Sequence, residues 1–487
     1  MVRLSRRGFL SASAAASAAA LLAACGGGAS PTAAPAKPTE APKPAAAAAQ
    51  GATAAPAAAP TIAPAATTAP AAGATPAAAA PAAGGKLVTF DYWHRSSGDA
   101  AKQLETLAND YSKQNEGKYK VSAIAQGEIA ELNKKIRAAA AGGGMPGATM
   151  GDDYDITQYA FSKIIVPLDP YLDDPQNGLT PAQRQDFLPN QLERHKLPIY
   201  EGKTMAFPQG FSAFTTFWNV DALKKAGFDA PPKSWKEFPD HVRAIAKANP
   251  NMSGWWIGGA GDRFISTLLT YGVDWITPDG KASQFDKPEA LEVMTWWRQL
   301  GDEKLLAVPK ENARDAFVAQ KAAYYMDSSG NTAGFYNLVK DFKWDASMPL
   351  QGKAGTTITE TYGPLNAVPK NDADKQLAGW LFLRWLCTTV PQSAWVKATN
   401  YFPSIKSAAD SAELKDYYSK NVVAAKLVKE VAPNARILGP SPALTEVRGQ
   451  ITANVVNEVL LGQLTPEQGV KKLKAEADKA ITRALQG

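Results

Sequence analysis

Between Gly26 and Gly85 the chain consists almost entirely of Ala, Pro, Thr and Gly, and it contains no aromatic residue. A segment of this composition has almost no apolar surface to bury, so it cannot offset the conformational entropy that folding removes. Its interspersed prolines favour extended conformations. We therefore predict a disordered Ala/Pro/Thr linker over residues 26–85, with a partner-binding motif as the alternative. The folded protein is then confined to the roughly 400 residues from Lys86 onward.

A targeting signal precedes this linker. Arg6 and Arg7 form a twin-arginine pair, and the Ala/Leu run after them is shorter than the roughly 20 apolar residues of a membrane-spanning helix. The run ends in LAAC, whose cysteine is Cys25. The segment resembles a bacterial Tat signal fused to a lipobox, in which the cysteine is lipidated. We expect residues 1–25 to be a Tat-type lipoprotein signal peptide. Cys25 would then anchor the exported protein extracytoplasmically, on the outer face of the cell membrane or in the periplasm; the alternative is a spare thiol in a discarded peptide.

The net charge shrinks when these 85 residues are set aside. The whole chain has 52 Lys and Arg against 46 Asp and Glu, a formal charge of +6. Five of the basic residues and one of the acidic ones precede Lys86, which leaves +2 for the remainder. We therefore expect no nucleic-acid partner. Two cysteines and three histidines in total argue against a disulfide scaffold, a metal site or a metal cofactor. Cys387, in the apolar run GWLFLRWLC, is expected to be buried on a helix.

Strand and helix patterns alternate at the start of the folded region. Residues 86–93 and 118–125 are rich in β-branched and aromatic residues, whereas 100–115 and 131–143 have apolar residues at helical spacing. This order predicts an α/β domain with a mainly parallel sheet. Ligands of such sheets bind beyond the carboxyl ends of the strands. By position, the site candidates are the residues around the end of the first strand: Trp93, His94, Arg95 and Ser96.

Two later segments predict a chain that passes between two lobes. Residues 203–219 are extended in character but are interrupted by Pro208 and Gly210, as a hinge crossing requires. A second extended stretch, 343–350, precedes the segment TTITETYGPLNAVPK. These stretches predict more than one crossing. The last third of the chain has helical patterns, including one over 411–428.

The motifs of common catalytic sites are missing from the sequence. There is no H-E-x-x-H and no P-loop, and GGAGDRF lacks the last glycine of a dinucleotide fingerprint. We interpret GWWIGGAGDRF as a loop. Asp152, Asp153 and Asp155 form an acidic cluster with three interpretations: carboxylates for glycoside hydrolysis, acceptors for a polyol, or a solvated loop. Because hydrolysis needs a facing carboxylate and no second cluster stands out, we predict no catalytic residues and no enzyme activity.

Tryptophan is the conspicuous residue of the folded region. All twelve tryptophans follow Lys86, and several stand near Asp, Asn and Ser in segments that look like loops. This combination suits sugars, whose C–H faces stack on rings while their hydroxyls need hydrogen-bond partners. Trp93 and Trp256 are the candidates for ligand contact. Four others fall on predicted helices and are expected in the core: Trp296, Trp297, Trp380 and Trp385.

From Lys86 to Gly487 the sequence resembles the extracellular solute-binding proteins of bacterial ABC importers, in the carbohydrate-binding group called family 1. The most specific match is EGKTMAFPQGFSAFTTFWNVDALKKAGFDAPPKSWKEF, with the segments IVPLDPYL and MDSSGN as further matches. NYFPS resembles the family signature GYFPS, with Asn400 in place of Gly. A second departure is Pro146-Gly147, where the family has Pro-Asp.

The resemblance implies a periplasmic-binding-protein-like type II fold, in which two α/β lobes are joined by a hinge. We expect residues 86–210 and 350–397 in the first lobe, and 211–349 and 398–487 in the second. A monomer would trap a small carbohydrate or polyol between the lobes on hinge closure and deliver it to an ABC permease, without any cofactor. Matching positions imply ligand contacts from Trp93, His94, Asp153, Ser212, Trp256, Ser329, Gly363, Tyr401 and Arg436.

The ligand itself has alternatives. YWH, SSGN and RILGPSP resemble the glycerol-3-phosphate-binding branch of the family, but Arg436 is offset from that branch's arginine and Ile437 takes the nearer position. We therefore expect a neutral sugar or oligosaccharide, with glycerol 3-phosphate or a glycerophosphodiester as the alternative. A secreted carbohydrate-active enzyme and a cell-surface adhesin on a stalk are the competing function classes.

Overall fold

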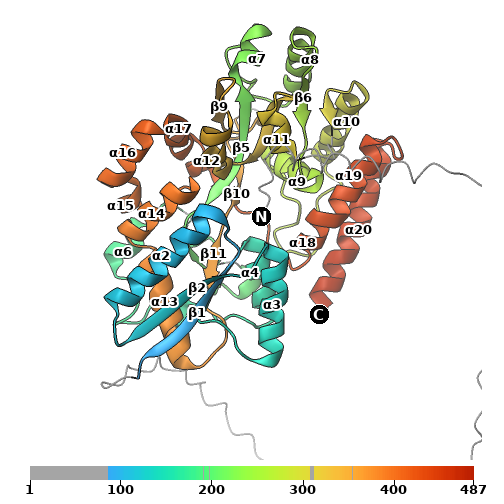
Figure 1. The fold of residues 1–487 in the computed structure, drawn as a ribbon. Helices are drawn as coiled ribbons and strands as arrows, with labels where there is room; N and C mark the ends of the chain where they lie inside the picture. Colours follow the sequence, from blue (N-terminus) through green and yellow to red (C-terminus); the bar gives the residue numbers. More distant parts are fainter. Residues whose placement is uncertain (1–85, 190, 197, 308–311, 354, 487) are drawn as a thin grey trace, which may run out of the picture. The chain divides into compact units, whose positions relative to one another are not determined.

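A computed structural model gives the fold of the region from Lys86 onward (Figure 1). Residues 1–85, with the predicted signal peptide, Cys25 and the linker, lie outside the described residues. The described ranges are 86–189, 191–196, 198–307, 312–353 and 355–486. Within these ranges, no helix combines the length and the apolar character that crossing a membrane requires.

The described residues form two β-sheets with helices around each, which confirms the predicted α/β class. The first sheet has the order β2-β1-β3-β11-β4, and β1 is parallel to both β2 and β3, whereas β11 is antiparallel to β3. Its strands are β1 (Val88–His94), β2 (Tyr119–Ala125), β3 (Ala148–Gly151), β4 (Phe207–Pro208) and β11 (Leu365–Ala367). The predicted β–α–β–α opening is confirmed.

Helices cover both faces of the first sheet because the side chains of a strand alternate between faces. On β1, Phe90 and Tyr92 pack with α2 and α13, whereas Trp93 packs with the core around α3 and α4. The helices with this sheet are α2 (Gly98–Gln114), α3 (Ile129–Gly142), α4 (Asp153–Phe161), α5 (Asp169–Leu172), α6 (Pro181–Asp186), α13 (Ala373–Leu386), α14 (Thr389–Thr399) and α15 (Lys406–Ala409). Cys387 follows α13 and is buried, as expected.

The second sheet has the order β12-β10-β5-β8-β6-β7, and β9 pairs with β5 in addition. Its strands are β5 (Ser212–Asn219), β6 (Ser253–Trp256), β7 (Leu306–Ala307), β8 (Ala322–Ser328), β9 (Trp344–Ser347), β10 (Thr359–Tyr362) and β12 (Ala435–Arg436). Every residue of β5 is buried. This strand therefore runs through the centre of the second half of the molecule, as Figure 1 shows.

Two apolar cores flank the second sheet. The larger one includes Trp235, Trp255, Trp296 and Trp297, so the expectation that the last two belong to the core is confirmed. Trp380 is likewise buried and Trp385 half-buried, both packed in the core of the first sheet.

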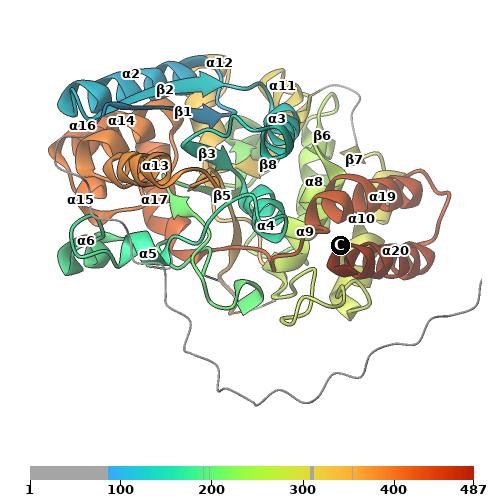
Figure 2. The ribbon, with the colours of Figure 1, turned by 90° about the horizontal axis from the view of Figure 1, so that it is seen from below.

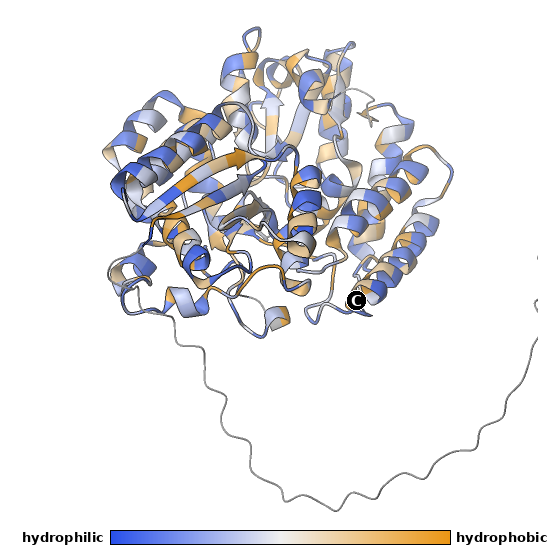
Figure 3. Ribbon diagram, turned by 60° about the horizontal axis from the view of Figure 1, so that its bottom comes forward, coloured by the Kyte–Doolittle hydropathy of each residue, from blue (hydrophilic) through white to orange (hydrophobic). Residues whose placement is uncertain are grey.

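Figure 2 shows α19 and α20 side by side, and Figure 3 shows hydrophilic and hydrophobic residues alternating along the outer helices. The helices are α7 (Val220–Lys225), α8 (Phe238–Ala248), α9 (Ala260–Thr270), α10 (Pro288–Asp302), α11 (Ala313–Val318), α12 (Thr332–Leu338), α16 (Ala412–Lys420), α17 (Val422–Glu430), α18 (Leu444–Glu446), α19 (Ala453–Leu460) and α20 (Pro466–Gln486).

Two predictions of local structure were wrong. GWWIGGAGDRF is not a loop: Ser253–Trp256 pairs in parallel with β8 and β7, and α9 begins at Ala260 after a turn in which Gly259 has φ +66°. Parallel pairing overrides the glycine content here, because strand neighbours on both sides satisfy the backbone. The helix predicted over 411–428 is broken at Asn421 into α16 and α17.

The chain crosses between the sheets more than once, as predicted, but the stretch 343–350 is not a crossing, because it contains β9, which pairs with β5 inside the second sheet. The chain passes from β4 to β5 at Gly210, and from β10 to β11 at Gly363. Both glycines have positive φ, +142° and +116°, and a side chain on either would lie 3.1–3.2 Å from backbone atoms of a neighbouring crossing segment. Only glycine accepts such a conformation at no cost. Phe402 pairs with Phe211 beside these crossings. The strand order places β10 with the second sheet; the lobe boundaries at 210, 350 and 397 stay a prediction.

Candidate functional site

A cavity of about 450 Å³ lies where the two sheets meet, and its lining comes from both. The first-sheet side contributes Arg95 after β1, the start of α4, and His195. The second-sheet side contributes the start of β5, the start of α9, and the ends of β8 and β10. A third part of the lining is the segment 437–449, which follows β12. The parallel strand β1 and the strand β8 thus end at the cavity, as expected for an α/β site.

Asp153 is the most heavily bonded group on the first-sheet side. The Arg194 guanidinium donates to it twice, at 3.1 Å from Nε and 2.5 Å from Nη2, and His195 Nε2 lies 3.0 Å from its Oδ1. Burial alone would raise the pKa of Asp153, but Arg194 and His195 outweigh burial and lower the pKa to about 2. Arg194 also donates to the carbonyl of Gly363 at 3.4 Å, so this group connects α4 to a crossing segment.

The acidic cluster at the start of α4 divides into two kinds of group. Asp152 and Asp153 line the cavity, and Arg95 donates to Asp152 at 2.6 Å. Asp155 is fully buried away from the cavity, where it accepts from the Asp152 backbone N–H at 2.8 Å and from Asn133 at 2.6 Å. Burial and the Asp152 charge raise the pKa of Asp155 to about 8. The solvated-loop interpretation of this cluster is therefore wrong.

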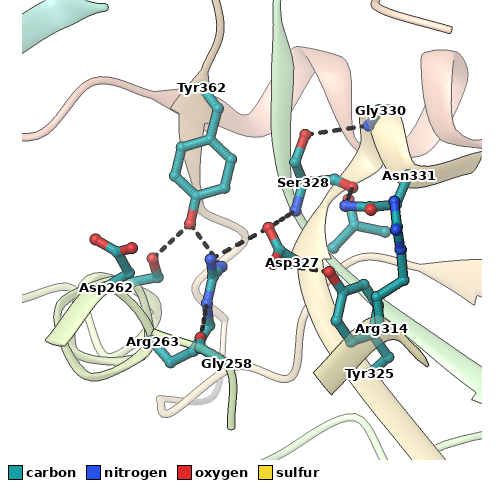
Figure 4. Close-up of polar contacts among 12 residues, drawn as sticks. Gly258, Asp262, Arg263, Arg314, Tyr325, Asp327, Ser328, Gly330, Asn331 and Tyr362 are labelled. Carbon is teal, nitrogen blue, oxygen red and sulfur yellow. Dashed lines mark hydrogen bonds and ion pairs between the residues drawn. The ribbon is translucent and has the colours of Figure 1, made fainter. Parts of the chain in front are cut away.

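Arg263 organises the second-sheet side (Figure 4). It stands in the first turn of α9 and donates to Gly258 O at 3.2 Å, to the Tyr362 hydroxyl at 3.0 Å and to Asp327 at 3.1 Å. Its guanidinium also lies over the Phe214 ring, 5.5 Å from the centroid. Asp327 in turn accepts from Ser328 N at 2.6 Å and from the Tyr325 hydroxyl at 2.9 Å. These bonds fix the Arg263 guanidinium and the Asp327 carboxylate in one orientation.

Arg448 makes a second buried ion cluster beside the first. It donates to Glu360 at 2.6 Å and to Asp262. It sits on a π-helical turn, Val447–Thr452, of the kind that often marks functional sites. This turn packs on α9 because Gly261 has no side chain: a Cβ there would lie 2.0 Å from Arg448 O. Burial raises the pKa of Glu360, although Arg448 and Ser266 oppose that rise.

The remaining wall of the cavity is apolar. Ile437, Leu438, Pro440 and Leu444 form it, and the rings that line the cavity are those of Tyr154, Tyr362 and Tyr401 besides His195. None of the twelve tryptophans, all of which the structure describes, contributes to this lining. The cavity therefore offers ion-paired polar groups and hydroxyls on one side and aliphatic surface on the other. Such a lining fits a small solute with many hydroxyls and a C–H face.

Four of the predicted contact residues meet at this cavity: Asp153, Ser212, Gly363 and Tyr401. Ser212 accepts a hydrogen bond from Ser328 at 2.8 Å, and Gly363 lies at the crossing from β10 to β11. The other five predicted residues lie outside its lining: Trp93, His94, Trp256, Ser329 and Arg436.

The positions of these five have simple physical causes. Trp93 and Trp256 pack against apolar cores, and the Ser329 hydroxyl accepts the Ala213 N–H at 3.2 Å. His94 is fully buried, and burial lowers its pKa to about 4, so it is neutral at pH 7. Arg436 is exposed and bonds the carbonyls of Pro433 and Ala435, whereas its neighbour Ile437 lines the cavity.

Several charged residues of the site were not found from the sequence: Arg194, His195, Asp262, Arg263, Asp327, Glu360 and Arg448. A signal existed for two of them. Asp327 stands near the carboxyl end of an apolar strand, and Glu360 is a charge inside a strand-like run. Arg263 was hidden by the interpretation of its segment as a loop. No pattern marks Arg194 or Arg448, which the fold brings to the cavity from distant segments.

Comparison with known proteins agrees with this architecture. A family model described as bacterial extracellular solute-binding protein matches residues 106–420. The sn-glycerol-3-phosphate-binding periplasmic protein UgpB of Salmonella typhimurium is 23% identical over 355 residues, which cover 69% of this chain and 78% of that protein.

Two solved structures share the fold, each at 19% identity and a TM-score of 0.70. One is the cyclic alpha-maltosyl-1,6-maltose binding protein of Arthrobacter globiformis, covering 82% of this chain and 100% of that one. The other is UgpB of Mycobacterium tuberculosis in complex with glycerophosphocholine, covering 82% and 99%. Because the family model matches more than half of the length of this chain, the chain belongs to the bacterial extracellular solute-binding proteins.

Proposed function

We propose that this protein is the substrate-binding component of an ABC importer, which captures a sugar or oligosaccharide between two lobes and delivers it to a membrane permease. The observation that carries the proposal is the cavity where the two sheets meet, lined from both sides by fixed polar groups. A ligand that bonds Asp152 on one side and Ser328 on the other stabilises the closed arrangement of the lobes. The protein acts as a monomer, without a cofactor.

Glycerol 3-phosphate or a glycerophosphodiester is the second candidate, because the curated relative is named for glycerol 3-phosphate. The position of Arg436 favours the sugar. Its side chain is exposed and bonded to backbone carbonyls, and the aliphatic Ile437 takes its place in the lining. The arginines that do line the cavity are each bonded to a carboxylate of the protein.

Hydrolysis of a glycoside is less well supported. It needs a carboxylic acid that keeps its proton at neutral pH and faces the substrate. The pKa of Asp153 is lowered to about 2, and although burial alone would raise the pKa of Asp262, the Arg448 and Arg263 charges lower it. Glu360 has a raised pKa, but Arg448 and Ser266 occupy its carboxylate oxygens. The proposal therefore assigns binding and no bond cleavage.

Saturable binding of at least one neutral sugar is the expected result of a calorimetric titration with mono- and oligosaccharides, amino sugars and glycerol phosphates. Asp327→Ala should weaken that binding by about tenfold or more, because it frees Arg263 as well as removing an acceptor. Asp99→Ala is the matched control, since Asp99 is an exposed carboxylate on α2 and should leave affinity unchanged. Chromatography of the incubated ligand checks for cleavage. Turnover of any glycoside, or the absence of binding to every compound of the panel, would contradict the proposal.

We further propose Tat export and lipid anchoring through Cys25, supported by the twin arginines, the apolar run and the LAAC sequence in register. Cys25→Ser should shift the exported protein from the membrane fraction to the soluble one, and Arg6→Lys with Arg7→Lys should block export. Fractionation of cells with an antibody to the folded region measures both. An unchanged membrane fraction for Cys25→Ser contradicts the anchor.

A further inference from the structure

The charged groups of the cavity are arranged in two layers, with carboxylates in front of arginines. The side chain of Asp262 is 40% exposed, that of Asp327 25% and that of Asp153 23%. Their partners Arg448, Arg263 and Arg194 are only 12%, 7% and 2% exposed. These three ion pairs thus present their negative ends to the ligand. Two other pairs do the opposite: Arg95 is 27% exposed against 19% for Asp152, and Arg448 is 12% exposed against 2% for Glu360.

The charge of the lining is also negative in sum. Five carboxylates line the cavity, against the three guanidinium groups of Arg95, Arg263 and Arg448. Adding the buried Arg194 behind Asp153 gives five carboxylates against four guanidinium groups, one carboxylate in excess. Low-dielectric walls strengthen the field of such a charge inside a cleft. A phosphate could reach Arg95, but it would have to displace Asp327 and Asp262 to reach Arg263 and Arg448 from the cavity.

Asp262 occupies the start of α9, a backbone feature that would otherwise attract an anion. A helix N-terminus carries partial positive charge and binds phosphates readily. Here Asp262 occupies that position, because its carboxylate lies 3.1 Å from where a Cβ of Gly259 would be. Only one Asp262 oxygen is bonded, to Arg448; the other accepts no hydrogen bond within the described part of the chain. This acceptor at the cavity wall is open to solvent, and a donor of the ligand can replace water on it.

We propose that the ligand of this cavity carries a basic nitrogen among its hydroxyls, as in an amino sugar or an aminated polyol, and that Asp262 receives it. The proposal rests on the proposed function and narrows its substrate class. A protonated amine supplies up to three donors and a positive charge. It satisfies the unpaired Asp262 oxygen and balances the excess negative charge of the lining. The aliphatic wall of Ile437, Leu438 and Leu444 faces the C–H surface of the same ligand.

Matched series of three probes test the proposal by calorimetry at pH 7, where an amine is largely protonated. The first series is glucose, glucosamine and glucose 6-phosphate, and the second is the same trio built on the tightest sugar found by titration. The aminated member should bind about tenfold more tightly than its parent, and the phosphate more weakly than either. Higher ionic strength should reduce the advantage of the amine. A phosphate or a neutral member that binds most tightly in the second series overturns the proposal.

Asp262→Asn separates the charge of this residue from its shape. The variant should lose most of the affinity advantage of the aminated probe over its neutral parent, and this ratio is read whatever the affinity of the parent becomes. Asp99→Asn is the control, because it removes an exposed charge that is not part of the cavity lining. An amine-to-parent ratio that is unchanged in Asp262→Asn refutes the proposal, even if sugars bind. Absence of binding to all probes instead contradicts the proposed function, whereas a preference for phosphate leaves that function standing.

Discussion

Replacement of Arg448 by methionine is expected to lower the free energy of unfolding by about 3–5 kcal/mol and to abolish ligand binding. Breaking a buried ion pair from one side leaves an uncompensated charge in a medium that solvates it poorly. Arg448 serves two carboxylates, and the side chain of Glu360 is only 2% exposed. The guanidinium also lies over the Tyr362 ring at 5.5 Å, so the change removes the packing of a cavity-lining residue as well.

Equilibrium unfolding of the full chain in urea measures this loss. Arg483→Met is the matched control, since Arg483 bonds both oxygens of Glu446 at 2.6 Å but is 58% exposed, and such surface pairs contribute less than about 1 kcal/mol. Adding Glu360→Gln to Arg448→Met should recover part of the loss. Lower pH should also reduce the difference in stability between Arg448→Met and wild type. Without Arg448, the pKa of Glu360 in the folded state rises further. The folded variant therefore binds a proton at a pH at which the unfolded chain does not, and this favours the folded state as the pH falls. A loss no larger than that of Arg483→Met would contradict the buried-pair argument.

The architecture could be predicted because it depends on local patterns. The alternation of 86–93, 100–115 and 118–125 is a matter of residue periodicity, which a single sequence displays. The crossing at Gly210 was visible as Pro208 and Gly210 inside an extended run, whereas the crossing at Gly363 was not located from the sequence. The strand β6 was missed: it is only four residues long, and its stability comes from parallel neighbours more than 50 residues away in the chain. Long-range pairing of that kind leaves no local pattern.

The candidate site could be predicted only where it depends on position along a strand or on a matched motif. Asp153, Ser212, Gly363 and Tyr401 were predicted in that way, and all four line the cavity. The aromatic argument pointed to Trp93 and Trp256 because it used residue type alone, and a tryptophan near a strand end is as well suited to a core as to a sugar. The arginines were missed because their function lies in ion pairs across separations such as 41 residues for Asp153–Arg194 and 88 for Glu360–Arg448. Only the folded chain creates those pairs.

The departure Pro146-Gly147 from the family pattern is explained by packing. A Cβ on Gly147 would lie 2.5 Å from Cδ2 of Phe90, so an aspartate at this position could not coexist with that phenylalanine in place. On the other side, α13 approaches the same residue so closely that a Cβ on Gly379 would lie 1.9 Å from Gly147 O. The two glycines therefore allow α13 to lie directly on β3, the strand that leads into Asp152 and Asp153.

Gly379→Ala is accordingly expected to destabilise the protein by about 1–3 kcal/mol, although alanine in a helix interior normally gains up to about 1 kcal/mol over glycine. The atoms in the way are backbone atoms of Gly147, so no side-chain rotation relieves the overlap. Displacement of β3 should also move the start of α4 and weaken sugar binding several-fold. Urea unfolding and calorimetry measure the two effects.

Gly334→Ala on α12 is the matched control, because its nearest neighbour would be a flexible Leu338 methyl group at 3.8 Å. That variant should gain stability or stay unchanged, as helix propensity alone predicts. The opposite signs of the same substitution in two helices distinguish close packing from propensity. If Gly379→Ala stabilised the protein as well, the close approach of α13 to β3 could not be what holds the acidic turn of α4 at the cavity.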